Sequence, residues 1–195
     1  MFHVTPPKLH LMHRVRGFTL IEVLVVIGIV AVLMQIAAPS FKSQIQAGTM
    51  RSNVNSFLAD MRFARSESIR RGGGVVMCRS NAPESTQACN GTTGASNGWV
   101  TGWIIFHDLN NNGARDSGES ILRVQIPITS IDSIVDGSGT PKYKFPFDAT
   151  GRLPIGNAAT IQFGGGDYSN TVQRVVCVNQ GGYARIAGDG NASCS

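Results

Sequence analysis

The residues from Asp108 to Glu119 have the types and the spacing of a calcium-binding loop. Their sequence fits the pattern D-x-[DN]-x-[DN]-G-x5-E, in which oxygen atoms at alternating positions surround the ion. The expected ligands are the side-chain oxygens of Asp108, Asn110, Asn112, Asp116 and Glu119 and the main-chain carbonyl of Ala114. A weak calcium site is therefore one interpretation of this loop, and no other cofactor is expected. Asn and Asp also favour tight hairpin loops through local hydrogen bonds, and this alternative stays open.

The four cysteines, Cys78, Cys89, Cys177 and Cys194, predict disulfide bonds. All four follow an apolar segment that is expected to be membrane-bound, so they lie on the side predicted to be translocated and oxidising. Four cysteines allow three pairings. We favour Cys78 with Cys89 and Cys177 with Cys194, because each pair closes a short local loop. A zinc site is the rival interpretation, but the chain has no C-x2-C pair.

Residues for catalysis are few. The chain has no P-loop and no H-E-x-x-H or C-x-x-C motif. His107 is the only histidine after residue 13, and it lies beside a turn-rich loop without an evident partner. We therefore predict an assembly or binding protein and not an enzyme.

One carboxylate, Glu22, stands inside a long apolar segment. Residues 18–38 read FTLIEVLVVIGIVAVLMQIAA, and Glu22 is their only ionisable side chain. The length matches the ~20 residues that cross a bilayer as a helix. A carboxylate there costs roughly 2.5–3.5 kcal/mol on insertion scales, so we expect it to have a functional partner.

The formal charge of +5 is concentrated at the N-terminus. Lys8, Arg14 and Arg16 precede the apolar segment and no acid accompanies them, which leaves 14 Lys and Arg against 12 acids, or +2, after residue 17. A basic flank before an apolar helix predicts a cytoplasmic N-terminus and a translocated remainder.

The helix is expected to continue over residues 39–71 as an amphipathic half and to stop at Gly72-Gly73-Gly74. Its polar side is basic, which usually indicates a solvated face. Short β-like segments separated by turns follow, which predicts an antiparallel sheet. They are Val75–Cys78, Gly98–His107, Ile121–Ile126, Ile131–Val135, Tyr143–Phe147, Thr160–Phe163, Arg174–Val178 and Tyr183–Ile186.

The N-terminal residues carry a family resemblance. Arg16-Gly17-Phe18-Thr19-Leu20-Ile21-Glu22 and the apolar run after them closely resemble the leader and methylation site of type IV pilins and type II secretion pseudopilins. The resemblance implies that a prepilin peptidase cuts between Gly17 and Phe18 and methylates the new amino group of Phe18. It also implies that Glu22 pairs with the α-amine of a neighbouring subunit during assembly, which offsets the desolvation of both charges.

A second block resembles the GspH/FimT group of minor pilins. Gly102-Trp103-Ile104-Ile105-Phe106, the Asp108 loop and Ala64-Arg65-Ser66-Glu67 match its motifs. The resemblance implies a pilin-like α+β fold, with one long N-terminal helix packed on a C-terminal antiparallel β domain. The expected divisions are a leader (1–17), a transmembrane and filament-core helix (18–38), its amphipathic continuation (39–71) and a β-rich extracytoplasmic domain (72–195).

Some FimT-like pilins bind DNA through a G-R-x-R motif near the C-terminus. Here the corresponding residues are Gly182-Tyr183-Ala184-Arg185, with Tyr183 in place of the first arginine. The candidate DNA contacts are therefore Arg185, Tyr183 and Arg174, with stacking and phosphate binding as the expected chemistry.

The leading interpretation is a minor pilin or pseudopilin that enters a type IV pilus or a type II secretion filament near its tip. The alternative is a DNA-binding minor pilin for natural transformation. The expected partners are a prepilin peptidase, other minor and major pilins, the bacterial inner membrane, and, in addition, DNA or secreted proteins. We expect a single-pass inner-membrane protein with a periplasmic C-terminal domain.

Overall fold

The computed structural model describes residues 17–91, 98–137 and 141–194. The chain divides into two compact units, Met1–Phe41 and Lys42–Ser195. The second unit is called the head below. Of the expected leader, only Gly17 belongs to the described residues.

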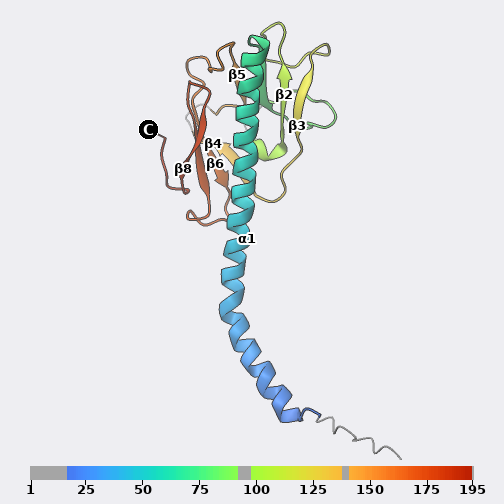
Figure 1. Ribbon diagram of the computed structural model, residues 1–195, viewed down its shortest axis with the longest axis vertical. Coiled ribbons are helices and arrows are strands. Elements are labelled where there is room, and N and C mark those ends of the chain that lie inside the picture. Colours follow the sequence, from blue (N-terminus) through green and yellow to red (C-terminus); the bar gives the residue numbers. More distant parts are fainter. Residues whose placement is uncertain (1–16, 92–97, 138–140, 195) are drawn as a thin grey trace, which may run out of the picture. The chain divides into compact units, whose positions relative to one another are not determined.

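Helix α1, Leu20–Arg71, contributes to both units (Figure 1). Thr19 caps its start, because the Glu22 amide donates to Thr19 Oγ1 at 3.3 Å. In the first unit, every described side chain from Phe18 to Phe41 is exposed, including large apolar residues such as Leu24 and Ile27. Among the described residues of this unit, none covers this apolar surface.

The apolar part of α1 is the part of the chain to be considered as a membrane-spanning segment. Among the described residues, no single helix is long and apolar enough to cross a bilayer. Leu20–Gln35 and Ser40–Arg71, taken together, have the length and composition of a membrane-spanning segment.

In the head, α1 buries one stripe of side chains. The buried positions are Met50, Val54, Phe57, Leu58, Asp60, Met61, Ala64 and Ser68, most of which recur with the helical period. The helix ends as expected at the three glycines. Gly72 adopts φ 78°, and the Gly73 amide donates to the Ser68 carbonyl at 2.7 Å, as in a Schellman motif.

Two antiparallel four-stranded sheets complete the head. The first sheet has the order β3-β2-β1-β5, and its strands are Ile121–Gln125, Trp103–His107, Val75–Arg79 and Lys144–Phe147. The second has the order β4-β6-β7-β8, and its strands are Ser133–Asp136, Ala159–Gly164, Arg174–Val178 and Ala184–Gly188. The resulting architecture, a long N-terminal helix packed on antiparallel sheets, is the α+β fold expected from the sequence.

Aromatic side chains from the helix and both sheets meet at Phe57. Its ring contacts Trp99, Trp103, Phe145 and Phe163 edge to face, with centroids 5.5–6.5 Å apart. Each such pair adds roughly 0.5–1.5 kcal/mol beyond its buried area. Phe57 therefore ties the second half of α1 to both sheets.

One expected strand is partly wrong. Residues 98–107 do not form a single strand, because Trp99–Thr101 is a 3-10 helix and β2 begins only at Trp103. Gly98 and Gly102 bracket this turn with φ of 64° and 101°, which other residues rarely adopt. The turn places Trp99 in the core, where its ring stacks on Phe145 at 5.3 Å.

Candidate functional site

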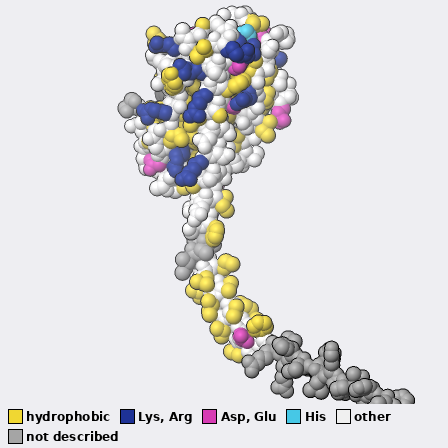
Figure 2. Space-filling view, viewed as in Figure 1, with side chains coloured by type: hydrophobic (Ala, Val, Ile, Leu, Met, Phe, Trp, Pro, Cys, Tyr) yellow, Lys and Arg dark blue, Asp and Glu magenta, His cyan; other side chains and the backbone are white. Residues whose placement is uncertain are grey.

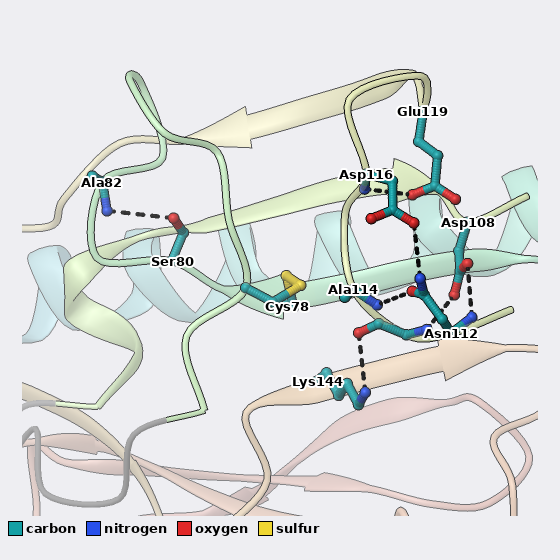
Figure 3. Close-up of a disulfide and its surroundings, with 11 residues drawn as sticks. Cys78, Ser80, Ala82, Asp108, Asn112, Ala114, Asp116, Glu119 and Lys144 are labelled. Atoms are coloured by element: carbon teal, nitrogen blue, oxygen red, sulfur yellow. Dashed lines mark hydrogen bonds between the residues drawn. A yellow bond between two sulfur atoms is a disulfide. The ribbon is translucent and has the colours of Figure 1, made fainter. Parts of the chain in front are cut away.

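The cysteines form the two short-range disulfides that the sequence favours. Cys78 bonds Cys89 and Cys177 bonds Cys194, with Cα atoms 5.5 and 5.6 Å apart. Figure 3 shows Cys78 on the central strand of the first sheet. On that face Cys78 belongs to a small buried cluster, against which Cys89 packs. The second disulfide ties the C-terminal segment to β7.

Within the Asp108–Glu119 loop, main-chain amides donate hydrogen bonds to the carboxylates of Asp108 and Glu119. Asp108 accepts hydrogen bonds from the amides of Asn112 and Gly113, and Glu119 accepts from those of Leu109 and Asp116. Figure 3 shows the carboxylates of Asp108, Asp116 and Glu119 turned toward nitrogen atoms of the loop.

The other expected calcium ligands of this loop are also engaged. Asp116 accepts from the side-chain amides of Asn110 and Asn112 at 2.8 Å, and Asn112 Oδ1 accepts from the Ala114 amide. The Lys144 ammonium group lies 3.0 Å from the neighbouring Gly113 carbonyl, where it opposes a cation. Within the described residues, no group of three or more His, Cys, Asp and Glu is placed to hold a metal. These hydrogen bonds favour the local alternative for the loop, and the calcium site stays a prediction.

The three candidate DNA contacts, Arg174, Arg185 and Tyr183, have different surroundings in the head. Arg174 Nη1 donates to the carbonyls of residues 171, 172 and 173, so its guanidinium group folds back on its own turn. Arg185 pairs with Cys177 across the sheet and lines a cavity with Cys177 and Cys194. Tyr183 instead contacts α1. Neither of the cavities lined by Tyr183 and by Arg185 is lined by another of the three residues.

Tyr183 pairs with Arg65 of α1. The Arg65 guanidinium group lies over the Tyr183 ring, 3.8 Å from its centroid, and Arg65 Nε donates to the Gly151 carbonyl at 3.0 Å. Both contacts join residues that are far apart in the chain, so spacing could not predict them.

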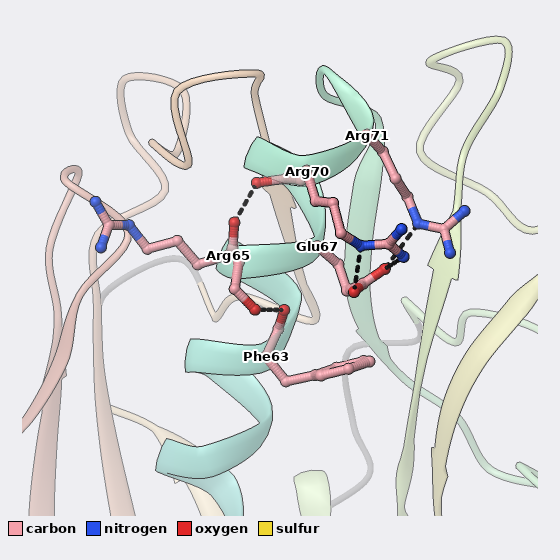
Figure 4. Close-up of polar contacts among 7 residues, drawn as sticks. Phe63, Arg65, Glu67, Arg70 and Arg71 are labelled. Atoms are coloured by element: carbon pink, nitrogen blue, oxygen red, sulfur yellow. Dashed lines mark hydrogen bonds and ion pairs between the residues drawn. The ribbon is translucent and has the colours of Figure 1, made fainter.

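The arginines of the helix end fall into two groups. Glu67 accepts hydrogen bonds from Arg70 Nε at 3.0 Å and from Arg71 Nε at 2.8 Å. These contacts, that of Arg70 first, lower the pKa of Glu67 to about 2. Figure 4 shows Arg65 pointing to the opposite side of α1 from this cluster. Arg65 therefore belongs to a different surface.

Asp60 is the main polar anchor of the helix in the core. It is 5% exposed, accepts from Trp103 Nε1 at 2.7 Å and pairs with Arg123 Nη1 at 2.6 Å. The Arg123 guanidinium group also lies 4.1 Å from the centroid of the Phe63 ring. These contacts fix the helix to β2 and β3.

Glu22 is exposed in the first unit, as are the apolar side chains around it. Figure 2 shows apolar side chains over the surface of this part of α1. On the visible face of the head, Lys and Arg side chains gather over α1 and the strands beside it (Figure 2). The described part of the first unit thus presents an apolar surface that contains Glu22, and the visible face of the head presents basic side chains.

Two families match the sequence. One is described as type II transport protein GspH and matches residues 53–182. The other is described as a prokaryotic N-terminal methylation motif and matches residues 12–37. No curated protein matches the chain.

Among solved structures, the chain is similar to the type IV minor pilin FimU of Pseudomonas aeruginosa. One crystal form matches with a TM-score of 0.52 and 17% identity, over 75% of this chain and 93% of FimU. A second crystal form matches with a TM-score of 0.49 and 18% identity, over 74% of this chain and 98% of FimU. At this identity the first likeness shows a shared pilin-like fold.

Proposed function

The chain belongs to the family of type II transport protein GspH, and from this membership we propose that it is cut between Gly17 and Phe18 and joins a filament through the first half of α1. It is a minor pilin or pseudopilin of a type II secretion or type IV pilus system, and not an enzyme. Its methylation motif implies processing by a prepilin peptidase and partnership with other pilins. The motif and the hydrophobic helix are consistent with an inner-membrane prepilin.

The observation that carries the assembly proposal is the uncovered apolar surface from Phe18 to Phe41. Burying a large apolar side chain stabilises by about 1.5–3 kcal/mol, so this surface requires lipid before assembly and other subunits after it. The basic leader orients the chain with its N-terminus in the cytoplasm and its head in the periplasm.

Glu22 gives this apolar contact a defined register. Inside a bundle of such helices, an unpaired carboxylate is costly, whereas the methylated α-amine at Phe18 of a neighbour supplies the opposite charge. The subunit therefore docks where the two charges meet, and the head is presented near the filament tip.

Mass spectrometry of the chain from membranes tests the processing step. The expected mature protein begins at Phe18, carries one additional methyl group and contains two disulfides. Replacement of Gly17 by a bulkier residue leaves the leader attached. A mature chain that retains residues 1–17 contradicts the proposal.

DNA capture is a second candidate function, and the basic face of the head supports it. Arg185 is exposed on β8 and makes no ion pair with another described residue. A mobility-shift assay with the full chain at several salt concentrations tests it, since phosphate contacts make affinity fall with salt. Salt-sensitive binding that Arg185→Ala weakens supports DNA capture. Equal DNA binding by the parent chain and by Arg185→Ala would show that Arg185 does not contribute to the DNA-binding site.

A further inference from the structure

A groove of about 330 Å³ runs between α1 and the turn before β8. It is lined by Arg62, Arg65, Ser66, Ile69, Gly182, Tyr183 and Ala184. The helical residues stand at positions i, i+3, i+4 and i+7, so they form one stripe along α1. We call this feature the α1–β8 groove, and we propose that it binds an acidic segment with apolar side chains on a neighbouring filament subunit.

The charge of the groove is uncompensated. No Asp or Glu among the described residues lines it, and neither Arg62 nor Arg65 makes an ion pair with a described residue. The arginines of the next turn differ, because Arg70 and Arg71 share Glu67. Figure 4 shows that this pairing occurs on the other side of the helix from Arg65. The groove therefore complements a carboxylate that the head itself does not supply.

One basic group of the groove, that of Arg65, is held in place within the head itself. Arg65 is fixed by its stacking on Tyr183 and by its hydrogen bond to the Gly151 carbonyl. Gly151 leaves room for this arrangement, since a Cβ there would approach Arg65 Cγ and Ile69 Cδ1 within 3 Å. A pre-ordered guanidinium group loses less conformational entropy when it binds a carboxylate.

Apolar surface accompanies the charge. Ile69 is 50% exposed and Tyr183 is 58% exposed, although both side chains line the groove. A partner segment that carries acidic and apolar side chains would cover both features. Interfaces commonly combine an apolar or aromatic centre with Arg and a polar rim.

A protein segment fits these observations better than a nucleic acid does. Non-specific binding of single strands uses successive aromatic platforms along a basic track. Here Tyr183 is the sole aromatic residue in the described lining, and Arg65 covers one face of its ring. Arg185 and Arg174 line other parts of the surface.

The inference rests on the proposed function, because a neighbouring subunit meets this surface only in a filament. The test uses the full chain, in detergent micelles for binding and in cells for assembly. The probe is a labelled peptide of alternating Glu and Leu, with a Gln–Leu peptide and a single-stranded oligonucleotide as competitors. The variants are Arg62→Glu and Ile69→Asp, and Arg51→Glu is the control because it makes the same charge change on α1 outside the groove.

We expect Arg62→Glu and Ile69→Asp each to weaken peptide binding about tenfold, since they place like charges together. Both variants should also lower the amount of subunit in filaments several-fold, while Arg51→Glu leaves both measurements near the parent values. Thermal midpoints of the variants show that the head stays folded. The Gln–Leu peptide should compete poorly.

Each of four binding results overturns the groove assignment. They are no binding of the Glu–Leu peptide, equal binding of the Gln–Leu peptide, an equal loss of peptide binding in Arg51→Glu, and preferential binding of the oligonucleotide by the same residues. Failure of the proposed function looks different, because the parent chain itself would then keep its leader or stay out of filaments. A parent chain that is processed and assembled, with variants that assemble equally well, refutes only the groove.

Discussion

Both halves of α1 carry large apolar side chains, but only the second half buries them within its own chain. From Phe18 to Phe41 every described side chain is exposed, whereas from Met50 to Ser68 one stripe is completely buried against two sheets. The comparison separates two uses of one helix. The second half stabilises the head of its own chain, and the first half stores apolar surface for other molecules.

Replacement of the same residue type in the two halves gives the largest contrast. Phe57→Ala removes the centre of the aromatic cluster and should lower the free energy of unfolding of the head by about 3–5 kcal/mol. Phe41→Ala, at a side chain that is 65% exposed, should change it by less than ~0.5 kcal/mol. Denaturant unfolding of the full chain in micelles, followed by near-ultraviolet circular dichroism, measures both. Equal losses of unfolding free energy in the two variants would contradict the view that only the second half of α1 stabilises the head.

Loss of a disulfide should affect only the head. Replacement of Cys177 and Cys194 by Ala opens a loop with a sequence separation of 17 and should cost ~2–4 kcal/mol of unfolding free energy. Replacement of Cys78 and Cys89 opens a separation of 11 and serves as the comparison. Processing between Gly17 and Phe18 should continue in both variants. A block in processing would show that the first half depends on the head.

A smaller loss is expected at the polar anchor of the buried half. Asp60→Ala leaves Trp103 Nε1 and the Arg123 guanidinium group without their acceptor. The expected cost is about 2 kcal/mol, because hydrogen bonds to a charged group contribute more than neutral ones. Asp60→Asn keeps an acceptor for one of the two donors and should recover part of the loss. Thermal and denaturant unfolding of both variants tests this order, and an Asn variant no more stable than the Ala variant contradicts it.

The smallest effect concerns the end of the buried half. The pKa of Glu67 is lowered to about 2 by Arg70 and Arg71, so the ionised form stabilises the folded state. This contribution is complete above pH ~4.5, the ordinary range for a glutamate, and is lost as the pH falls toward 2. The stability difference between the parent and Glu67→Gln should therefore shrink over that interval. A difference that is constant from pH 5 to pH 2 would rule out the pairing as its source.

Local sequence signals predicted most of the fold. Short apolar segments between turns located most of the strands, and three consecutive glycines located the end of α1, because turns and helix ends have strong local requirements. The turn at Trp99–Thr101 was missed, since its apolar residues read as a strand until the core around Phe57 is known. Tertiary packing decided that segment.

The candidate sites were harder to predict than the fold. The spacing of Asp108 and Glu119 is that of a calcium loop, but main-chain amides of the loop donate hydrogen bonds to both carboxylates. The contact between Arg65 and Tyr183 depends on how β8 approaches α1, which no spacing encodes. The spacing of Arg62, Arg65, Ser66 and Ile69 is that of one helix face. The sequence does not show that this face lies against Gly182, Tyr183 and Ala184.

The most direct test of the division between the two halves is the amount of Glu22→Ala subunit in purified filaments, measured with the unfolding midpoint of the same protein. Leu24→Ala, an uncharged neighbour in the same exposed half, is the matched control. We predict that Glu22→Ala is processed and keeps the parent midpoint but is largely lost from filaments, while Leu24→Ala remains in them. Incorporation of Glu22→Ala at the parent level, or a lowered midpoint of its head, would contradict the account.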